Sequence, residues 1–394
     1  MGLSSSSPNT DKASGDGAAF DKGLVWGYSG MQGWRQSMED AHFTIGDLEG
    51  WSQCALFGVL DGHGGSLVAH FTAVHLPQEV SRVAGLAQTQ GVSAALQTAF
   101  HNVDELLGDE AYQEELRSYA ELGGKNQKTD ANLMGCTAVV CCISPTMIVV
   151  ANAGDSRAIL VRDGQVVPLS EDHKPQAPGE RARITRAGGT VERQQLGPFV
   201  QFRVNGHLNL SRSIGDLQYK RNEQLAPHEQ IICSTPDVQV FPRNPADEFI
   251  VMACDGIWDV LSNQDVASFV RERMRAQGLI GPGAARNSKT RPISRIAEEL
   301  LDHCIPMDLS TTGGLGGDNM TALVIALGTA GHDLGPGSVL GAAAGWSGAH
   351  ASQISNASFR TDDSDGFSSE ETSVSPSGFC GCTTGLSKSS STVK

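Results

Sequence analysis

The sequence lacks the features that would place a protein in a membrane, in the secretory pathway or on a nucleic acid. It has no apolar run of about 18 residues, the length that a membrane-spanning helix needs. Residues 1–20 are polar and do not resemble a secretory signal. No basic stripe occurs, and a formal net charge of −15 repels the phosphates of nucleic acids. We therefore expect a cytoplasmic protein that does not bind nucleic acid.

The chain also lacks a cysteine framework. Its nine cysteines include no CxxC pair, and only Cys141 and Cys142 are adjacent, inside an apolar run. An odd number of cysteines without regular spacing is typical of reduced thiols inside a cell. A structural zinc site is not supported, because the usual spacing of zinc ligands is missing.

Several catalytic motifs are absent as well. There is no GxSxG nucleophile elbow, no GxxxxGK[ST] phosphate loop, no HExxH helix and no GxGxxG fingerprint. The glycine cluster Gly313–Gly317 has the wrong spacing for that fingerprint. We therefore look for chemistry that needs neither a serine nucleophile nor a nucleotide loop.

Apolar residues are scarce, at 39 % of the chain, and the deficit lies at the two ends. The segments 1–21 and 331–394 are rich in Ser, Gly, Thr and Asp and show no periodic apolar pattern. We expect both to be disordered, because such a composition buries too little apolar surface to offset the entropy of the chain. The remaining residues, 22–330, have a suitable length for a single domain.

This body alternates short apolar runs with amphipathic helical patterns. The predicted strands are Leu24–Tyr28, Ala41–Ile45, Cys54–Leu60, Thr137–Ile143, Met147–Ala153, Arg157–Val161, Glu248–Cys254 and Met320–Ala326. The predicted helices are Ser66–Val83, Val92–Leu107, Asn263–Ala276 and Ile293–Cys304, with a Gly- and Pro-containing loop over 277–292. The strands follow one another in hairpin-like groups, which favours an α+β fold with antiparallel sheets over a doubly wound parallel sheet.

Four aspartates stand at the ends of predicted buried strands, each close to glycine: Asp61, Asp155, Asp255 and Asp318. A carboxylate beside a core is unfavourable unless a positive charge neutralises it. Glycine lets carbonyl oxygens and water approach a hard cation closely, and oxygen-only ligands favour magnesium or manganese. Asp and Gly are also ordinary turn residues, so the pattern indicates a metal site without proving that the four carboxylates meet.

Two further segments carry candidate catalytic groups. His63 follows Asp61 by two residues, a suitable position for a general acid, although a solvated loop histidine is the alternative. Arg35 lies four and five residues before Glu39 and Asp40, and its guanidinium suits bidentate binding of phosphate. Glu39 is a candidate metal ligand, and a surface ion pair with Arg35 is the alternative for this segment.

Together these segments resemble the metal-dependent protein serine/threonine phosphatases of type 2C. Eight blocks match in family order: Gly33–His42, Phe57–Gly65, Gly135–Ala138, Ala151–Ala158, His173–Pro175, Leu210–Asp216, Ala253–Val260 and Gly317–Thr321. The resemblance covers residues from about 22 to 328. One block alone would be weak, whereas eight in order are specific.

The resemblance implies a four-layer sandwich of two antiparallel sheets flanked by helices, with two magnesium or manganese ions at one edge. The implied ligands are Glu39, Asp61, the carbonyl of Gly62, Asp255 and Asp318, while Asp155 and Asp259 belong with Asp255 to a third, weaker metal site. Asp61 would bridge the two ions, and Asp40 would orient water from behind the ligands.

The same resemblance implies that Arg35 grips the phosphate and that His63 protonates the leaving alkoxide. The partners would be phosphorylated proteins, whose phosphoserine and phosphothreonine are hydrolysed by metal-activated water. Residues 176–209 match a flap beside the active site. Residues 176–179 and the 277–292 loop depart from the family pattern, which leaves the choice of substrate open.

A catalytically inactive relative that keeps the fold as a binding module is the alternative function. Such a protein is expected to lose metal ligands, whereas Glu39, Asp61, Asp255 and Asp318 are all present. The sequence therefore favours an enzyme, which we expect to be a monomer.

The first residues carry one targeting pattern. Met1 to Ser6 fit the rule for N-myristoylation of Gly2, although a Met-Gly start with a nearby serine is also common by chance. A single acyl chain gives only marginal, reversible attachment to a membrane. Neither Lys12 nor the tail cysteines Cys380 and Cys382 make a strong second signal. Peripheral membrane contact is therefore expected only through an acylated Gly2.

Overall fold

The computed structural model describes residues 4–87, 91–122, 130–196, 199–280 and 292–328. The chain divides into two compact units, 1–344 and 345–394, and all described residues belong to the first. Gly2, the predicted tail over 331–394 and most of the predicted loop over 277–292 lie outside the described residues. Those three predictions stay untested.

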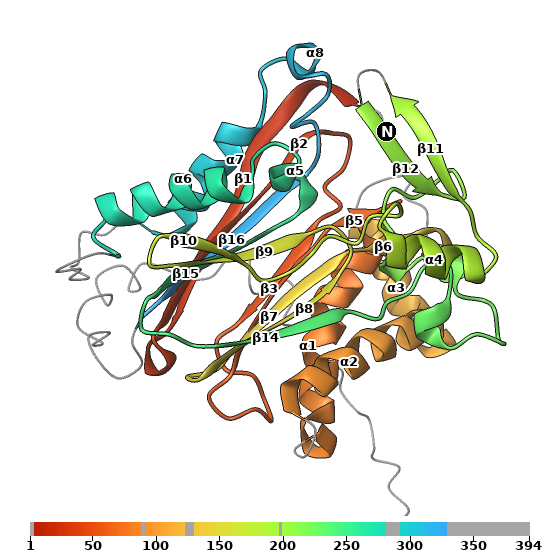
Figure 1. Cartoon of the computed structure of the whole chain (residues 1–394), viewed down its shortest axis with the longest axis horizontal. Coiled ribbons are helices and arrows are strands. Elements are labelled where there is room, and N and C mark those ends of the chain that lie inside the picture. The colour runs from red at the N-terminus through yellow and green to blue at the C-terminus, as the bar shows by residue number, and fades with distance from the viewer. Residues whose placement is uncertain (1–3, 88–90, 123–129, 197–198, 281–291, 329–394) are drawn as a thin grey trace, which may run out of the picture. The chain divides into compact units, whose positions relative to one another are not determined.

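Two antiparallel sheets form the centre of the fold (Figure 1). One has six strands in the order β1 (Ser4–Ala19), β2 (Leu24–Arg35), β16 (Met320–Leu327), β15 (Asp247–Ala253), β9 (Arg157–Arg162) and β10 (Gln165–Pro168). The other has five, in the order β14 (Asp237–Pro242), β8 (Met147–Ala153), β7 (Ala138–Ile143), β4 (Ala55–Leu60) and β3 (Ala41–Ile45). The prediction of antiparallel sheets is confirmed.

The central strands are apolar on both faces because each sheet is covered on both sides. In β4, Phe57 and Val59 pack between the two sheets, whereas Leu56 and Leu60 pack against helices. The rings of Phe57 and of Trp26, on β2 of the other sheet, meet edge to face with centroids 5.1 Å apart. Burial on both faces explains why these strands read as unbroken apolar runs in the sequence.

Helices form the two outer layers. α1 (Leu67–Ala87) and α2 (Gly91–Gly108) cover the five-stranded sheet, and α6 (Asn263–Ala276) and α7 (Ser294–Cys304) cover the six-stranded one. In α2 the buried residues Leu96, Phe100, Val103 and Leu107 recur at the spacing of one helical face. The predicted four-layer sandwich is therefore confirmed. None of the described helices is both long and apolar enough to cross a membrane.

The prediction of disorder over 1–21 is wrong for Ser4–Ala19, which forms β1. This strand pairs with β2 from Ser4↔Arg35 to Ala19↔Leu24, with two register shifts. A polar segment can be ordered in this way because an edge strand gains its backbone hydrogen bonds from its partner and needs no core of its own. Asp16 adds an anchor, since its carboxylate accepts a hydrogen bond of 2.8 Å from the backbone N–H of Ser294 in α7.

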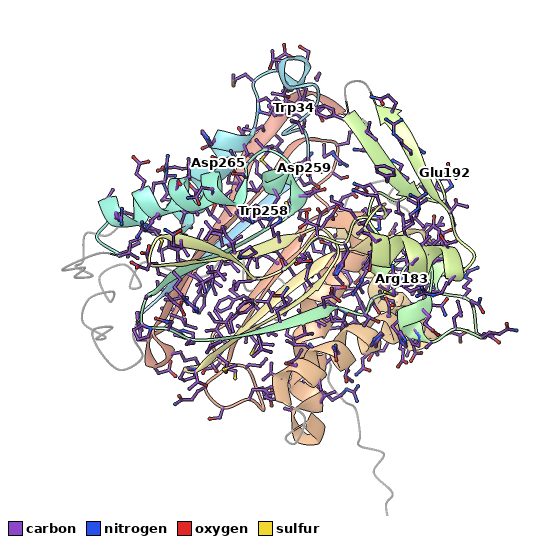
Figure 2. The ribbon with its side chains drawn as sticks, viewed as in Figure 1. Trp34, Arg183, Glu192, Trp258, Asp259 and Asp265 are labelled. Atoms are coloured by element: carbon purple, nitrogen blue, oxygen red, sulfur yellow. The ribbon has the colours of Figure 1, made fainter. Side chains whose placement is uncertain are left out.

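Smaller elements surround one end of the sandwich. β5 (Gly62–His63), β6 (Gly135–Cys136) and β13 (Ile214–Gly215) form a three-stranded sheet, and β11 (Val191–Leu196) pairs with β12 (Phe199–Val204) in a separate hairpin. The remaining helices are α3 (Gln113–Leu122), α4 (Pro178–Arg186), α5 (Asp255–Trp258) and α8 (Leu309–Thr312). Short 3₁₀ turns occur at Phe20–Lys22, Glu110–Tyr112, Ala131–Leu133, Leu217–Tyr219 and Pro227–Glu229. The region expected as a flap contains α4, with Arg183, and the hairpin, with Glu192 (Figure 2).

Candidate metal centre

Acidic residues from both large sheets converge where their central strands end. Asp61 follows β4, Asp255 follows β15 at the start of α5, and Asp318 precedes β16. Because β15 and β16 are paired neighbours, with Ala253 opposite Ala322, their acidic ends meet at the same edge. The sequence indicated these strand ends, and the structure brings them together.

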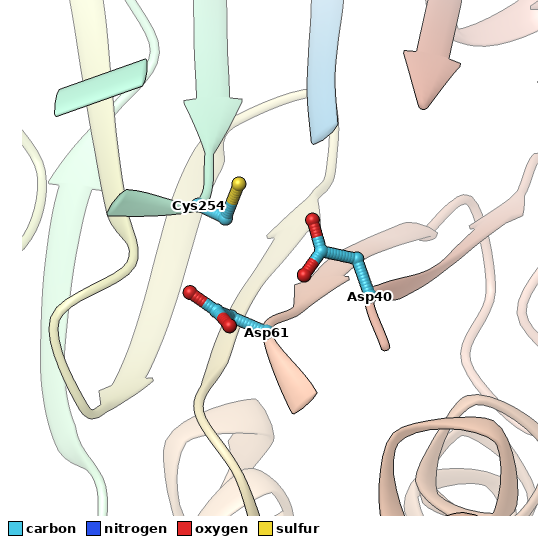
Figure 3. A group of neighbouring side chains, drawn as sticks. All are labelled: Asp40, Asp61 and Cys254. Atoms are coloured by element: carbon cyan, nitrogen blue, oxygen red, sulfur yellow. The ribbon is translucent and has the colours of Figure 1, made fainter. Parts of the chain in front are cut away.

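The centre of the cluster is formed by Asp40, Asp61 and Cys254, whose side-chain ligand atoms all lie within 4.8 Å of one another (Figure 3). Burial raises the pKa of Asp61 well above its usual value, and the negative charges of Asp255 and Asp40 raise it further. The pKa of Asp255 is raised for the same reasons, burial first and then the charge of its neighbours. Each of these carboxylates makes it less favourable for its neighbours to ionise. A cation bound between them would offset this repulsion.

Asp40 provides the test of whether such a cation fits. Its Oδ2 atom accepts a hydrogen bond of 2.8 Å from the hydroxyl of Thr321. Its Oδ1 atom is buried and has no partner among the described residues. Burial raises the pKa of Asp40 to about 7. An unpartnered buried carboxylate oxygen beside Asp61 fits a metal ion with its water, which would supply the missing partner.

Glu39 joins the cluster beside Gly62. A Cβ atom on Gly62 would lie 2.1 Å from the backbone oxygen of Glu39, so only glycine fits at this position. The Glu39 carboxylate accepts hydrogen bonds from the Ser37 hydroxyl at 2.8 Å and from the Gly65 N–H at 3.2 Å. The N–H of Glu39 donates to the side chain of Asn319 at 2.9 Å, which ties this segment to the start of β16.

Cys254 was not among the predicted site residues, although it directly precedes Asp255. Its sulfur accepts a hydrogen bond from the Thr321 N–H at 3.1 Å, and its thiol donates to the Asn319 carbonyl at 3.5 Å. Burial raises the pKa of this thiol well above its usual value. A neutral, hydrogen-bonded thiol is a poor metal ligand, so the donor set consists of oxygen atoms and suits a hard cation such as magnesium or manganese.

Two cations border the acidic cluster. The guanidinium of Arg35, at the end of β2, pairs with Asp318. The ammonium group of Lys174 pairs with Asp155, a buried residue that also acts electrostatically on Asp255. Sequence reasoning missed Lys174, which lies in the His173–Pro175 block but has no role implied by its sequence position.

Asp259, by contrast, is exposed one turn after Asp255, next to Trp258 (Figure 2). Although the residue as a whole is exposed, partial burial of its carboxyl group is the main cause that raises its pKa; the charge of Asp155 raises it further and that of Lys174 lowers it. Asp155 and Asp259 both act electrostatically on Asp255, and the third metal site itself stays a prediction.

His63 lies on the other side of the cluster, on β5. Its Nε2 atom is 2.7 Å from the Oδ2 atom of Asp216. Burial lowers the pKa of His63, but the charge and hydrogen bond of Asp216 outweigh this effect and raise it above its ordinary value. Asp216 was also missed, because nothing in its sequence position indicates that it contacts His63.

One cavity of about 770 Å³ gives access to this centre. The residues that line it include Arg35, His63, Lys174, Asp255, Asp259 and Asp318 from the cluster, Gln176 and Phe199–Arg203 of β12 from the flap region, and Leu133 and residues 313–317. Glu39, Asp40, Asp61 and Asp155 do not line it. The cavity that leads to the cluster is therefore lined both by basic side chains, which can bind an anion, and by carboxylates, which can bind a cation.

Comparisons with known proteins agree with this arrangement. Residues 25–312 match the family model described as protein phosphatase 2C. The chain is 41 % identical over 341 residues to a protein phosphatase 2C homolog 2 of Aspergillus flavus, covering 83 % of this chain and 68 % of that protein. It is 38 % identical over 327 residues to a probable protein phosphatase 2C 4 of Paramecium tetraurelia, covering 83 % and 99 %.

A solved phosphatase structure from Toxoplasma gondii has a similar fold, with a TM-score of 0.60 and 22 % sequence identity over 81 % of this chain and 96 % of that one. A serine-threonine phosphatase 2C structure from the same organism gives a TM-score of 0.57 at 20 % identity, over 82 % and 98 %. At these identities the likeness concerns the fold alone.

Proposed function

The chain belongs to the protein phosphatase 2C family and is a protein phosphatase, and on this premise we propose that it hydrolyses phosphoserine and phosphothreonine in proteins with water activated at a divalent-metal centre. The observation that carries the proposal is the pairing of the buried Asp40 with the partly buried Asp61, in which one Asp40 carboxylate oxygen has no partner among the described residues. The ligand set of the family is complete here, which supports an enzyme over an inactive binding module.

The ligands in the proposal are Glu39, Asp61, the carbonyl of Gly62, Asp255 and Asp318, with Asp155 and Asp259 at a third position. Bound magnesium or manganese ions supply an activated water near neutral pH and offset the charge of the phosphoryl oxygens. Asp40 orients water through its free Oδ1 atom, since its Oδ2 atom is held by Thr321. Gly62 lets the backbone of Glu39 pack directly against its own, and its carbonyl would be the backbone ligand.

Arg35 binds the phosphate in this proposal. Its guanidinium reaches the cavity and is oriented by Asp318, and planar N–H donors match the geometry of phosphate oxygens. Its pKa is raised: burial alone would lower it, but the charge of Asp318 prevails. Arg35 is therefore charged near neutral pH, as an arginine side chain in a protein is in general.

His63 donates the proton to the leaving alkoxide. It lines the same cavity as Arg35, and its side chain is 24 % exposed, so a substrate can reach it. The contact with Asp216 holds the ring in one orientation and favours its protonated form, which is the form that a general acid requires.

The test is hydrolysis of p-nitrophenyl phosphate and of a phosphothreonine peptide by the purified protein. We expect turnover of both with manganese or magnesium, and loss of turnover when a chelator is added. Restoring the metal should restore activity. Absence of metal-dependent turnover on both substrates would overturn the proposal.

We also propose that Gly2 is N-myristoylated and that this directs a fraction of an otherwise cytoplasmic protein to membranes. The support is the sequence pattern at Met1 to Ser6 alone. Because one acyl chain binds membranes weakly, the attached fraction should be partial and reversible. Fractionation of cells that express the wild type and Gly2→Ala tests this, and an unchanged distribution would contradict it.

A further inference from the structure

We propose that a substrate phosphopeptide binds in an extended conformation as a third strand along the free edge of β12, which carries the phosphorylated residue to the metal centre. The inference rests on the proposed function, because it names the surface that the protein substrate would use. It goes further in assigning recognition to backbone hydrogen bonds of the hairpin β11–β12.

The edge of β12 faces the cavity. Five consecutive residues of this strand, from Phe199 to Arg203, line the cavity that also contains Arg35 and Asp318. Successive side chains in a strand point to opposite faces, so one face of β12 would contribute only alternate residues to a cavity. Five in a row indicate that the edge of the strand is turned towards the cavity, because residues of both faces then contribute.

The hydrogen-bond register identifies which backbone groups point outward. In the hairpin, Val204 lies opposite Val191, but its N–H donates to the carbonyl of Leu208 at 2.7 Å, away from β11. Partners in an antiparallel pair alternate between bonded and non-bonded positions. Phe199, Gln201 and Arg203 therefore bond to β11, whereas Val200 and Phe202 direct their N–H and C=O groups outward.

These outward groups have no partner within the described part of the chain. The sheet that contains β12 has β11 as its other strand and no third strand. The turn after β12 uses the outward groups of Val204, which leaves those of Val200 and Phe202 open. A row of open backbone donors and acceptors is the surface to which an extended peptide adds a strand.

The chemistry around this edge fits a phosphopeptide. Arg35, Lys174 and Arg203 line the same cavity and can attract a phosphate dianion. Leu133, Val200 and Leu315 also line it and are exposed by 45 %, 42 % and 37 %, so apolar side chains beside the phosphorylated residue have contacts available. A volume of about 770 Å³ lies in the range that holds a ligand of many atoms rather than a single phosphate group.

The first experiment uses the wild-type protein and a set of phosphothreonine peptides of one sequence, each N-methylated at a single backbone position. We expect KM to rise about two- to tenfold for methylation at alternate residues, because each blocks one hydrogen bond to β12, and to change little at the residues between them. The intervening positions serve as matched controls for the added methyl group. A profile without a two-residue period would overturn the proposal.

A pair of variants tests the protein side. Val200→Pro removes an outward N–H without removing a bond to β11, a position at which an edge strand tolerates proline. Val200→Ala removes the side chain and keeps the N–H. We expect the proline variant to raise KM for the peptide about two- to tenfold more than the alanine variant. Equal effects of the two variants on KM would contradict the proposal. Thermal unfolding of both variants checks that neither substitution destabilises the fold outside the hairpin.

The outcomes separate this inference from the proposed function. If the protein hydrolyses p-nitrophenyl phosphate with metal but shows no two-residue period, the strand addition fails and the phosphatase stands. If no substrate is hydrolysed, the proposed function itself fails. If size-exclusion chromatography shows dimers that Val200→Pro dissociates, the edge pairs with a second copy of the chain, and the peptide proposal is overturned.

Discussion

The Nε2 atom of His63 lies 2.7 Å from the Oδ2 atom of Asp216, a residue 153 positions further along the chain. The Asp216 side chain is only 1 % exposed, and it also accepts a hydrogen bond of 2.6 Å from the hydroxyl of Ser213. Its own N–H donates to the Met134 carbonyl at 2.6 Å. The carboxylate is therefore fixed on several sides and orients the imidazole through Nε2, so that Nδ1 is the ring nitrogen that would face the substrate.

Asp216→Asn should impair phosphopeptide hydrolysis more than hydrolysis of p-nitrophenyl phosphate. A positioned general acid contributes on the order of a hundredfold or more, but only when the leaving group is a poor one. An alkoxide needs a proton as it leaves, whereas p-nitrophenolate does not. We expect a loss of roughly tenfold or more in kcat for the peptide and a much smaller loss for the aryl ester.

His63→Gln is the reference for this comparison and should show the same dependence on the leaving group. Asp104→Asn is a matched control, because Asp104 pairs with Lys220 and holds the Gly215 N–H at 2.8 Å but does not contact His63. It should affect the two substrates alike. An equal loss on both substrates in Asp216→Asn would show that the residue is merely structural.

Asp61→Asn should abolish metal-dependent turnover and remove most of the stabilisation that metal provides. A ligand present at a hundred times its Kd stabilises the folded state by about 2.7 kcal/mol, and this gain requires the site. Without metal, the variant should be at least as stable as the wild type, because one of several mutually repelling buried carboxylates has been neutralised.

Thermal unfolding with and without manganese measures both effects. Glu223→Gln is the control, because Glu223 is an exposed acid outside the cluster, and it should keep the full metal-induced shift. A full shift in Asp61→Asn would place the metal elsewhere in the protein.

Much of the sandwich could be predicted from local pattern. The runs that became β4, β7, β8 and β16 are apolar at nearly every position, because their strands are buried between a sheet and a helical layer. The acidic residues at the ends of these runs could also be recognised as candidate metal ligands, because a carboxylate beside a buried strand is unfavourable unless a positive charge neutralises it. The eight blocks that match the phosphatase family in order then indicated that these strand ends belong to one site.

The remaining features depend on partners distant in the chain. Asp216 became part of the site only because β13 pairs with β6, which in turn pairs with β5 and His63. The strand β1 has a composition typical of disorder, and its stability comes from β2 and α7. Composition reports what a segment can bury by itself, so it fails where another segment supplies the contacts.

Asp16→Ala tests whether β1 is a stable part of the fold. The N-cap of α7 is Ile293, which has no side-chain acceptor, and Asp16 supplies one from another element by accepting from the Ser294 N–H at 2.8 Å. Loss of a capping acceptor costs about 0.5–2 kcal/mol. Urea unfolding should show this decrease, while Asp11→Ala, in the same strand but exposed, should change stability little. If both variants are equally stable, β1 does not contribute to the stability of the fold, and the prediction that residues 1–21 are disordered would stand.

Glu180 gives a prediction for the dependence of stability on pH. This buried residue of α4 accepts hydrogen bonds from Arg183 at 2.7 Å and from Arg212 at 2.8 Å. Burial alone would raise its pKa, but these guanidinium groups outweigh burial and lower the pKa from 4.5 to about 2. Between these two values the unfolded chain binds more protons than the folded one, so stability rises with pH.

The contribution of Glu180, on the order of 3 kcal/mol, is therefore fully present above about pH 4.5 and is lost as the pH falls towards 2. Glu180→Gln should be less stable than the wild type at pH 6, and the difference should shrink steadily as the pH is lowered to 3. Urea unfolding at each pH measures it. A difference that stays constant over this range would mean that the carboxylate charge does not hold α4 in place. The flap would then be positioned by packing of Ile184 and Val204 instead.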